Sequence, residues 1–474
     1  MSIAQEKKID NSKIENFEDF VAEVFERKLA EGREIIRKTL SELDVQLMAA
    51  RDTKQYRDKG LRSTSIKTKL GTIEYERHIC RDNQTGHYVY LLDDVINASD
   101  IGLMGSDITT IAKDMIKDSS FRATAKMISE STGLSISHQA VWNIVQESGR
   151  REIEQTEEIS KRVEKDSLHG NVDTKLLYQE ADGIWLKLQG ECRKKHGSSK
   201  EMKVGIAYDG VLYQQQKGGK IRRILDNKVA FDSFEPSKDF RRHHEAIIAS
   251  VYNTDEIELR VKNGDGANWI QRTDDCECIC VLDEFHRNKK LTECVTDKEK
   301  AQTLRELLLT NHINDLMDCL EAYINSSDNE QETAKLKELQ SYYSENCEAL
   351  PGYYDRGIKI PETRQPGVIH HARLGSMESN VFTLIGNRMK GRRACWSING
   401  ANNLAALLCK AHSTAEPDLN ALKKSALNEL THIKQSAGNT PKLEGKGREY
   451  PVRGTISPKL PEIAEIGKIK WFST

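Results

Sequence analysis

The sequence lacks any long apolar segment. Its 474 residues contain no run of 18 consecutive apolar residues, which is about the length that a membrane-spanning helix needs. The first eight residues include Lys7 and Lys8, but no apolar core follows them as it would in a secretory signal. We therefore expect a cytoplasmic protein that has no membrane partner.

The sequence also lacks a strong net charge. It has 71 Lys and Arg residues against 73 Asp and Glu residues, which gives a net charge of -2. This balance gives no global sign of nucleic-acid binding, so any contact with DNA must come from local clusters of cations. The ten cysteines are scattered, and in a protein without an export signal they are expected to be reduced thiols.

Proline is scarce and unevenly placed. The first is Pro236, and four of the nine lie in the last part of the chain, at positions 441, 451, 458 and 461. We expect residues 437–474 to form an extended, lightly packed tail. The rest is 30% charged overall and 37% hydrophobic, which is typical of amphipathic helices, and the length predicts two to four domains.

The first hundred residues change from a helical to a strand pattern. Residues 14–56 carry apolar positions at helical spacing, which predicts a region of N-terminal helices over 1–63, interrupted around Gly32. From Ser65 apolar and charged residues alternate, so we expect a small antiparallel sheet within residues 64–106, over positions 64–92.

Residues 107–160 have the spacing of a helix-turn-helix. A first helix is expected to end at Gly133, and Ser137 is placed to cap the second. An ordinary helical hairpin is the alternative. If the second helix enters a major groove, the side chains best placed for DNA are Arg122 for a phosphate and His138, Gln139 and Asn143 for base edges.

From residue 172 onward, strands alternate with helices. This order predicts a mixed sheet with helices on its faces, in a multidomain protein of the α+β or α/β class. A long helical stretch then predicts an all-helical insertion at residues 291–365. The expected strands are Lys175–Tyr178, Ile184–Gln189, Lys203–Tyr208, Lys228–Ser233, 257–262 and 278–282.

Three acidic residues lie where a metal-dependent phosphoryl-transfer site would place them. Asp182 is at a predicted strand-to-turn step, Asp265 directly follows a strand, and Glu378 is near a helix start. Divalent cations such as Mg²⁺ prefer oxygen ligands, and two of them about 4 Å apart can activate the attacking oxygen and stabilise the leaving one. Taken singly, an Asp beside glycine is more often a turn residue than a metal ligand.

The combination of these motifs resembles the ISLre-two family of bacterial insertion-sequence transposases, which is also catalogued as an uncharacterised conserved protein family and is similar to the mutator-like group. The resemblance covers nearly the whole chain. Its motifs include Glu180-Ala-Asp-Gly and Gly264-Asp-Gly-Ala-Asn-Trp-Ile. The most specific are Leu282-Asp-Glu-Phe-His-Arg-Asn-Lys and the stretch from Ser376-Met-Glu-Ser-Asn through Trp396-Ser-Ile-Asn-Gly-Ala-Asn-Asn.

The resemblance implies a ribonuclease H-like catalytic domain, formed by residues 170–290 and 366–436 around the helical insertion. Asp182, Asp265 and Glu378 would hold two Mg²⁺ or Mn²⁺ ions. Related transposases carry a Cys/Asp-x-x-His motif after the second catalytic Asp, and Asp283 and His286 fit it. His286 would position DNA or a phosphate, while Asp283 would hold its tautomer or simply cap a helix.

A cluster of cations follows the Glu378 segment and is either a phosphate-binding group or a solvated helix end. It consists of Arg388, Lys390, Arg392 and Arg393.

The expected activity is that of a DNA transposase. It would cleave and join strands at the terminal inverted repeats of an insertion sequence, act on target DNA, and work as a homo-oligomer on paired ends. A ribonuclease H-like nuclease, or a domesticated DNA-binding protein without transposition activity, is a second hypothesis. A helical DNA-binding regulator without metal dependence is a third.

Overall fold

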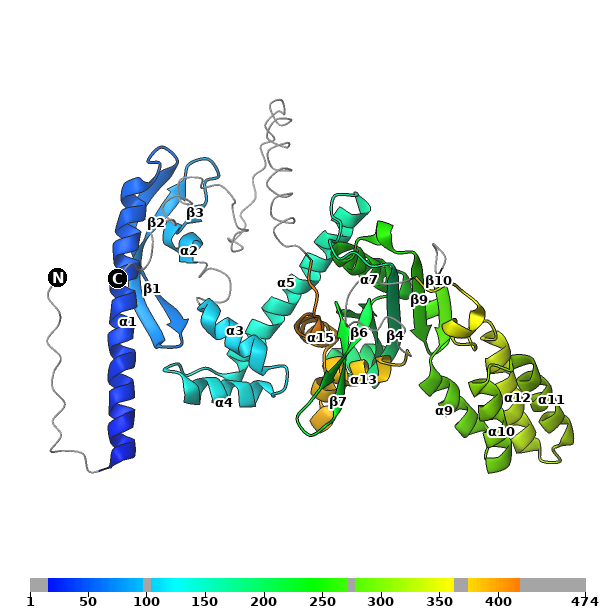
Figure 1. Ribbon diagram of the computed structural model, residues 1–474. Helices are drawn as coiled ribbons and strands as arrows, with labels where there is room; N and C mark the ends of the chain where they lie inside the picture. The colour runs from blue at the N-terminus through cyan, green and yellow to red at the C-terminus, as the bar shows by residue number, and fades with distance from the viewer. Residues whose placement is uncertain (1–15, 97–103, 272–277, 362–373, 418–474) are drawn as a thin grey trace. The chain divides into compact units, whose positions relative to one another are not determined.

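The computed structural model describes residues 16–96, 104–271, 278–361 and 374–417, with mixed helix and sheet (Figure 1). These residues fall into two compact units, of which the first ends at Glu147 and the second begins at Ser148. No helix among the described residues combines the length and apolar character needed to cross a membrane. The predicted tail at 437–474 lies outside the described residues.

The first unit begins with a long helix packed on a small antiparallel sheet. Its core contains Leu40, Leu47, Ile73, Tyr75 and Leu92. Its elements are α1 (Phe17–Ala50), β1 (Tyr56–Thr68), β2 (Gly71–Asp82), β3 (Tyr88–Val89) and α2 (Leu91–Ile96), with strand order β1-β2-β3.

Two details of this unit differ from the sequence-based prediction. Helix α1 passes through Gly32 without a break. The glycine lets Leu70 pack closely against the helix, because a Cβ at position 32 would lie 2.8 Å from Leu70 Cδ1. Strand β1 begins at Tyr56, before the predicted residue 64. After the buried Tyr56, residues 57–63 of β1 are exposed on both faces, so this stretch carries no alternation of apolar and polar residues.

Three further helices follow, α3 (Ser106–Met115), α4 (Phe121–Ser131) and α5 (His138–Glu164). Helix α4 ends at Ser131, two residues before the expected Gly133, because Thr132 turns out of the helix and its hydroxyl donates to the Ile128 carbonyl. Ser137 Oγ accepts a hydrogen bond from Ala140 N at 3.1 Å, as the predicted cap requires.

The second unit is organised around a five-stranded sheet. Its order is β10-β9-β4-β5-β8. Strands β9 and β10 run parallel to β4, whereas β5 runs antiparallel to both β4 and β8. The strands are β4 (Leu176–Lys187), β5 (Ser199–Tyr208), β8 (Val229–Ser233), β9 (Leu259–Gly264) and β10 (Cys278–Leu282).

Strand β4 is one continuous element, so the prediction of two strands separated at Asp182 is wrong. Its ladder with β5 runs without interruption, and Asp182 pairs with Val204 while Gly183 pairs with Lys203. The Asp-Gly pair, which suggests a turn, is therefore held extended by its neighbour strand. Asp182 lies within the sheet rather than at a strand end.

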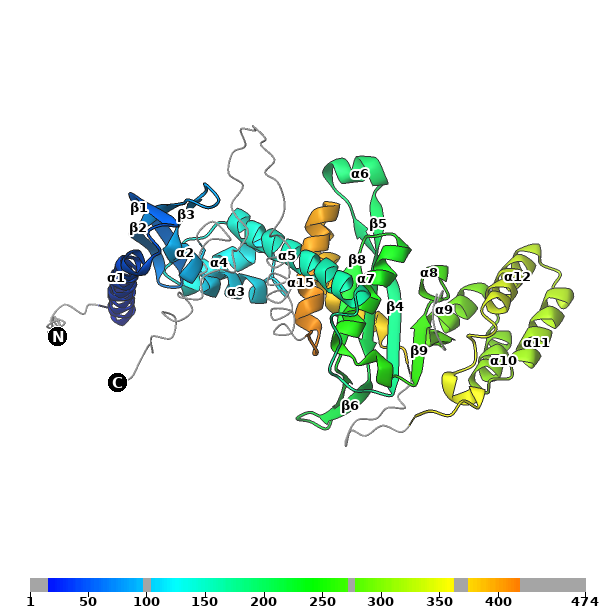
Figure 2. The ribbon, with the colours of Figure 1, turned by 90° about the horizontal axis from the view of Figure 1, so that it is seen from above.

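Helices cover both faces of this sheet. On one face, α7 (Ser237–Val251) packs Ile248 and Val251 against Leu177 of β4. On the other face, a Cβ at Gly386 would lie 3.6 Å from Ile184 Cδ1 of β4. Helix α15 lies beside β8, and the helical bundle extends from the β9–β10 side (Figures 1 and 2). The second face carries α13 (Met377–Val381), a π-helical turn (Phe382–Gly386), α14 (Asn387–Met389) and α15 (Ile398–His412).

Helices α9 to α12 form a bundle with its own core. The predicted insertion at 291–365 includes Leu291 and Cys294, which belong to the bundle core, and the helix that carries them, α9, begins at Glu284. The helices are α9 (Glu284–Cys294), α10 (Lys298–Leu309), α11 (Ile313–Ser326) and α12 (Glu330–Glu345).

The sequence analysis missed a two-stranded hairpin between β5 and β8. Its strands are β6 (Gly210–Gln215) and β7 (Ile221–Asp226). The short elements that complete the unit are α6 (Gly190–His196), α8 (Asn268–Gln271) and three 3-10 turns at Thr254–Glu256, Tyr353–Arg356 and Gly391–Arg393.

We expect Gly149→Ala to destabilise the protein although alanine favours helices by about 1 kcal/mol. A Cβ at Gly149 of α5 would lie 1.9 Å from the Asn403 carbonyl oxygen of α15, and backbone cannot move aside as a side chain can. The expected net loss of unfolding free energy is about 1–3 kcal/mol, measured by urea denaturation. Gly32→Ala is the control, since its Cβ would meet only the end of Leu70. Equal stability of the two variants would contradict the packing argument.

Candidate metal centre

Three side chains from three separate elements meet where β4 continues beyond the end of its pairing with β9. Asp182 of β4, His286 in the first turn of α9 and Glu378 of α13 each offer one ligand atom, and these atoms lie within 4.8 Å of one another. Asp182 is only 8% exposed, whereas Glu378 is exposed. The cluster is therefore walled by protein on one side and open on the other.

Asp265 lies beside this cluster without belonging to it. It directly follows β9, the parallel neighbour of β4, and its Oδ1 accepts a hydrogen bond from Ala267 N at 2.8 Å. Tyr342 of α12 donates to its backbone carbonyl at 2.9 Å. Its charge nevertheless influences the pKa of both Asp182 and His286. The structure thus brings two predicted carboxylates to ligand distance and places the third next to them.

The electrostatics of the cluster favour a bound cation. Burial raises the pKa of Asp182 to about 6, and the charges of Asp265 and Glu378 act in the same direction, while His286 opposes them. Like charges held in a partly buried place repel one another. A divalent cation would relieve that repulsion, and carboxylate oxygens are the donors that Mg²⁺ and Mn²⁺ prefer.

Asp283 supports His286 in two ways. Its Oδ1 caps α9 by accepting hydrogen bonds from Phe285 N at 2.9 Å and His286 N at 3.2 Å. The same oxygen lies 3.3 Å from His286 Nδ1. This contact is the main cause that raises the pKa of His286, with Asp182 and Asp265 acting in the same direction against burial. The protonated imidazole is thereby favoured beside the carboxylates.

A buried carboxylate behind the cluster joins the elements that carry it. Glu180 of β4 is 1% exposed, and burial raises the pKa of its carboxyl group, which the surrounding hydrogen bonds counteract. Its carboxylate accepts hydrogen bonds from Tyr208 Oη (2.6 Å), Asn263 Nδ2 (2.8 Å), Gly375 N (3.1 Å) and Ser376 N (3.0 Å).

This network fixes the ligand-bearing segments relative to one another. Asn263 of β9 also donates to Asp283 Oδ2 at 2.9 Å, so a single amide connects β4, β9 and the start of α9. Gly375 presents its N–H to Glu180 with a φ of +101°, a conformation that residues with a Cβ rarely adopt. Glu378 follows three residues later.

The sequence analysis missed Glu180 and Asn263 as supporting residues. A signal was present, because residues two apart on a strand point to the same face. Glu180 precedes Asp182 by two positions, and Asn263 precedes Asp265 by two. No pattern in the sequence indicates the third partner of Glu180, which is the backbone of Gly375 and Ser376.

Comparison with known proteins places the chain in a family. Residues 11–417 match the Uncharacterised protein family (UPF0236). The chain belongs to UPF0236. One UPF0236 protein of Caldanaerobacter subterraneus subsp. tengcongensis is 26% identical to it over 350 residues, covering 71% of the chain and 69% of the relative.

Further UPF0236 proteins from the same organism are similar to a comparable degree. One is 26% identical over 350 residues, covering 71% of the chain and 68% of the relative, and its name joins eleven gene designations. Another is 25% identical over the same length and share of the chain, and its name joins four.

The cations after Glu378 differ in their surroundings in this UPF0236 protein. The Arg388 guanidinium lies over the Trp396 ring at 5.7 Å, whereas Lys390 and Arg393 are exposed. The side chain of Arg392 lies outside what the structure describes. Trp396 itself is 5% exposed and donates from Nε1 to the Met389 carbonyl at 2.9 Å, so it anchors the helical segment that begins with Glu378.

The predicted DNA-contacting residues of the first unit lie on exposed helix surface. Arg122 is exposed on α4, and His138, Gln139 and Asn143 are exposed in the first turns of α5. Gln139 Nε2 donates to Asn143 Oδ1 at 3.0 Å, which places these two amides side by side. They stay candidate contacts.

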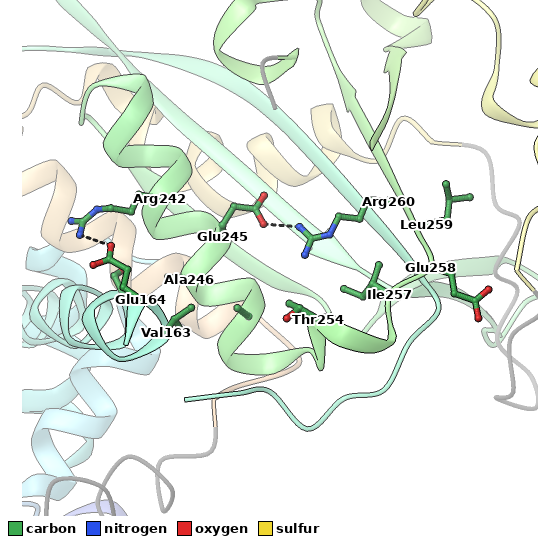
Figure 3. A pocket seen from close by; sticks show the side chains of 12 residues that line it. Val163, Glu164, Arg242, Glu245, Ala246, Thr254, Ile257, Glu258, Leu259 and Arg260 are labelled. Atoms are coloured by element: carbon green, nitrogen blue, oxygen red, sulfur yellow. Dashed lines mark hydrogen bonds and ion pairs between the residues drawn. The ribbon is translucent and has the colours of Figure 1, made fainter. Parts of the chain in front are cut away.

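A separate cleft of about 700 Å³ lies beside α7, near the C-terminal part of α5 and the start of β9. Figure 3 shows that its charges face one another: Arg242 pairs with Glu164 at 3.2 Å, and Arg260 pairs with Glu245 at 2.7 Å. Because these charges are already matched, the cleft offers much less unbalanced charge than the Asp182 cluster.

We expect Mn²⁺ to raise the melting temperature of the UPF0236 protein, with a shift that grows with the logarithm of free metal above its dissociation constant. Asp182→Asn should lose most of this shift, yet be as stable as the metal-free wild type or more so, because it removes one repelling charge. Asp265→Asn and Glu378→Gln should lose much of it too. Thermal melting with Mn²⁺ and with a chelator measures the effect.

Asp209→Asn is a matched control for that experiment. Burial raises the pKa of Asp209 to about 6, as it does for Asp182, but Asp209 is not among the clustered ligands. Its substitution should leave the Mn²⁺ shift unchanged. A full wild-type shift in Asp182→Asn would show that these carboxylates do not share a metal.

We expect Glu180→Ala to lower the free energy of unfolding by about 2–4 kcal/mol, because several buried donors lose their acceptor. It should also weaken Mn²⁺ binding, since the segment before Glu378 is released. Glu180→Gln should cost less, because it keeps one acceptor oxygen and the Tyr208 hydroxyl can rotate to accept. Urea denaturation and the Mn²⁺ shift measure both effects. Exposed Glu256→Ala is the control, and an unchanged metal shift in Glu180→Ala would exclude the positioning role.

Proposed function

We propose that this UPF0236 protein is a DNA transposase, which cleaves and joins DNA strands at the ends of an insertion sequence in a metal-dependent reaction. The observation that carries the proposal is the convergence of Asp182, His286 and Glu378, with Asp265 beside them. Three carboxylates and an imidazole at one sheet edge are suited to phosphoryl transfer.

The sheet supports a ribonuclease H-like catalytic domain. Its first three large strands along the chain, β4, β5 and β8, are antiparallel neighbours, and β9 and β10 are then added parallel to β4 on the other side. Asp182 lies on the central strand and Asp265 follows its neighbour. The bundle α9–α12 separates Asp265 from Glu378 along the chain, where the family resemblance implies a helical insertion.

The names of the relatives give independent support. One relative carries eleven gene designations and another carries four. A sequence present at many places in one genome is expected of an element that copies or moves itself. A housekeeping nuclease would not require such repetition.

The proposed chemistry consists of two direct phosphoryl transfers. Water attacks a phosphodiester at the element end and leaves a 3'-hydroxyl and a 5'-phosphate. That 3'-hydroxyl then attacks a phosphodiester of the target, forms the new bond and expels the target 3'-oxygen, which takes up a proton. Two divalent cations, when bound, activate the attacking oxygen and stabilise the leaving oxygen.

The side chains of this chain have separate tasks in that scheme. Asp182, Asp265 and Glu378 hold the cations. His286, whose pKa the contact with Asp283 raises, belongs to the same cluster and in its protonated form can neutralise a non-bridging phosphate oxygen. The open side of the cluster, where Glu378 is exposed, admits a duplex.

The first unit fits the task of recognising DNA ends. Helices α4 and α5 expose Arg122, His138, Gln139 and Asn143, and a helix-turn-helix role for these helices would suit terminal inverted repeats. Because two ends must be joined to one target, the active form is proposed to be a homo-oligomer assembled on double-stranded DNA in the cytoplasm.

We expect the purified protein to nick and join DNA that carries the inverted repeats flanking its gene, in Mn²⁺ or Mg²⁺ but not in a chelator. Asp182→Asn, Asp265→Asn and Glu378→Gln should reduce cleavage by at least about 10³-fold, because loss of the metals removes several kcal/mol of transition-state stabilisation. His286→Ala should slow cleavage and keep the metal requirement. Gel analysis of labelled DNA measures these rates.

The same assay separates the alternatives. Nicking without joining would favour a ribonuclease H-like nuclease, and DNA binding without any cleavage would favour a domesticated binding protein or a regulator. Wild-type cleavage by Asp182→Asn would exclude the proposed active site.

A further inference from the structure

The β6–β7 hairpin is a separate two-stranded sheet between β5 and β8 in the chain. All six residues of β6 pair with β7, from Gly210 with Asp226 to Gln215 with Ile221, so the ribbon is regular. Residues 213–222 are exposed without interruption. At the tip, Gly218 and Gly219 have φ values of +93° and +78° and would meet nothing within 4 Å of an added Cβ. Figures 1 and 2 show the ribbon extending beyond the sheet.

Apart from Asp226 at its base, the charge of this hairpin is of one sign. Residues 210–225 contain no Asp or Glu, in a chain whose overall charge is -2. The cations are Lys217, Lys220, Arg222 and Arg223. Lys217, Lys220 and Arg222 are exposed, and no carboxylate within the described ranges pairs with them. The cationic side of the ribbon is therefore available to an anionic partner.

The hairpin also exposes apolar and amide groups among its cations. Tyr213 is 51% exposed and Ile221 is 69% exposed, and three consecutive glutamines, Gln214 to Gln216, lie between them along the ribbon. An isolated two-stranded hairpin is only marginally stable in water. A ribbon that keeps large apolar side chains exposed gains stability when a partner covers it.

We propose that the β6–β7 hairpin is a DNA-binding ribbon that lies in a groove of double-stranded DNA, with Lys217, Lys220 and Arg222 contacting phosphates. A two-stranded ribbon has the width that the major groove accepts, and its amides can reach base edges. This inference rests on the proposed function in that it takes DNA to be the substrate.

The hairpin binds DNA away from the point of cleavage. Strand β5 pairs Val204 with Asp182 and ends at Tyr208, and the hairpin starts after that end. Four residues of strand correspond to about 13 Å, and the ribbon extends further in the next six. The hairpin therefore holds the duplex, and its cations take no part in metal binding.

The test uses the full chain and a short duplex whose binding is followed by fluorescence anisotropy between about 50 and 200 mM salt. We expect Lys217→Gln, Lys220→Gln and Arg222→Gln together to weaken binding about 10- to 100-fold. The slope of log affinity against log salt should fall by about two to three, which is nearly one for each lost phosphate contact.

The matched control removes the same charge from the helical bundle. Lys298→Gln, Lys335→Gln and Lys337→Gln change three exposed lysines, and should leave affinity within about twofold and the salt slope unchanged, because bulk charge alone is a weak influence. Both triple variants should keep the wild-type melting temperature and Mn²⁺ shift.

The outcomes distinguish this inference from the proposed function. If the hairpin variant binds the duplex as tightly as the control variant, the hairpin is not the binding ribbon, while the transposase proposal stands. If the hairpin variant loses affinity but Asp182→Asn keeps metal-dependent cleavage, the ribbon stands and the proposed active site fails. If the wild type binds no duplex at all, both are overturned.

Discussion

The burial of one carboxylate, Glu180, constrains the rest of this site. Removing a carboxylate from water costs several kcal/mol unless donors surround it, and here the donors come from three separate parts of the chain: the Tyr208 hydroxyl, the Asn263 amide and the Gly375–Ser376 backbone. Two of these parts lie next to a proposed ligand, because Asn263 precedes Asp265 by two residues and Ser376 precedes Glu378 by two. Satisfying Glu180 therefore also sets the distances between Asp182, Asp265 and Glu378.

The site places its negative charge at an open edge and its support in the interior. Glu180 and Asn263 are buried on strands of the sheet, whereas Glu378 is exposed. Asp283 acts on these charges from the side, because its contact raises the pKa of His286. Buried, hydrogen-bonded support beneath closely spaced, partly exposed charges is the arrangement expected where an ion and an anionic substrate both bind.

Much of this could be predicted from the sequence, and the exceptions have physical causes. The helix and strand order from β8 to α9 follows from apolar periodicity. Asp182 was expected at a turn because Asp-Gly is common there, but pairing with β5 overrides that local preference. Gly32 suggested a helix break, but the helix continues through it and the missing Cβ leaves room for the Leu70 side chain. The β6–β7 hairpin was missed because both of its faces are exposed, so no alternation marks its strands.

The order in which the chain supplies its ligands matters during translation. Asp182, Asp265 and His286 precede the helices α10 to α12, whereas Glu378 follows them. A ribosome therefore completes all five strands of the sheet and the whole bundle before it adds Glu378. A nascent chain holds an incomplete ligand set until most of the protein has been made, and a copy shortened by a stop codon within the bundle retains the strands of the sheet without ever acquiring the last carboxylate.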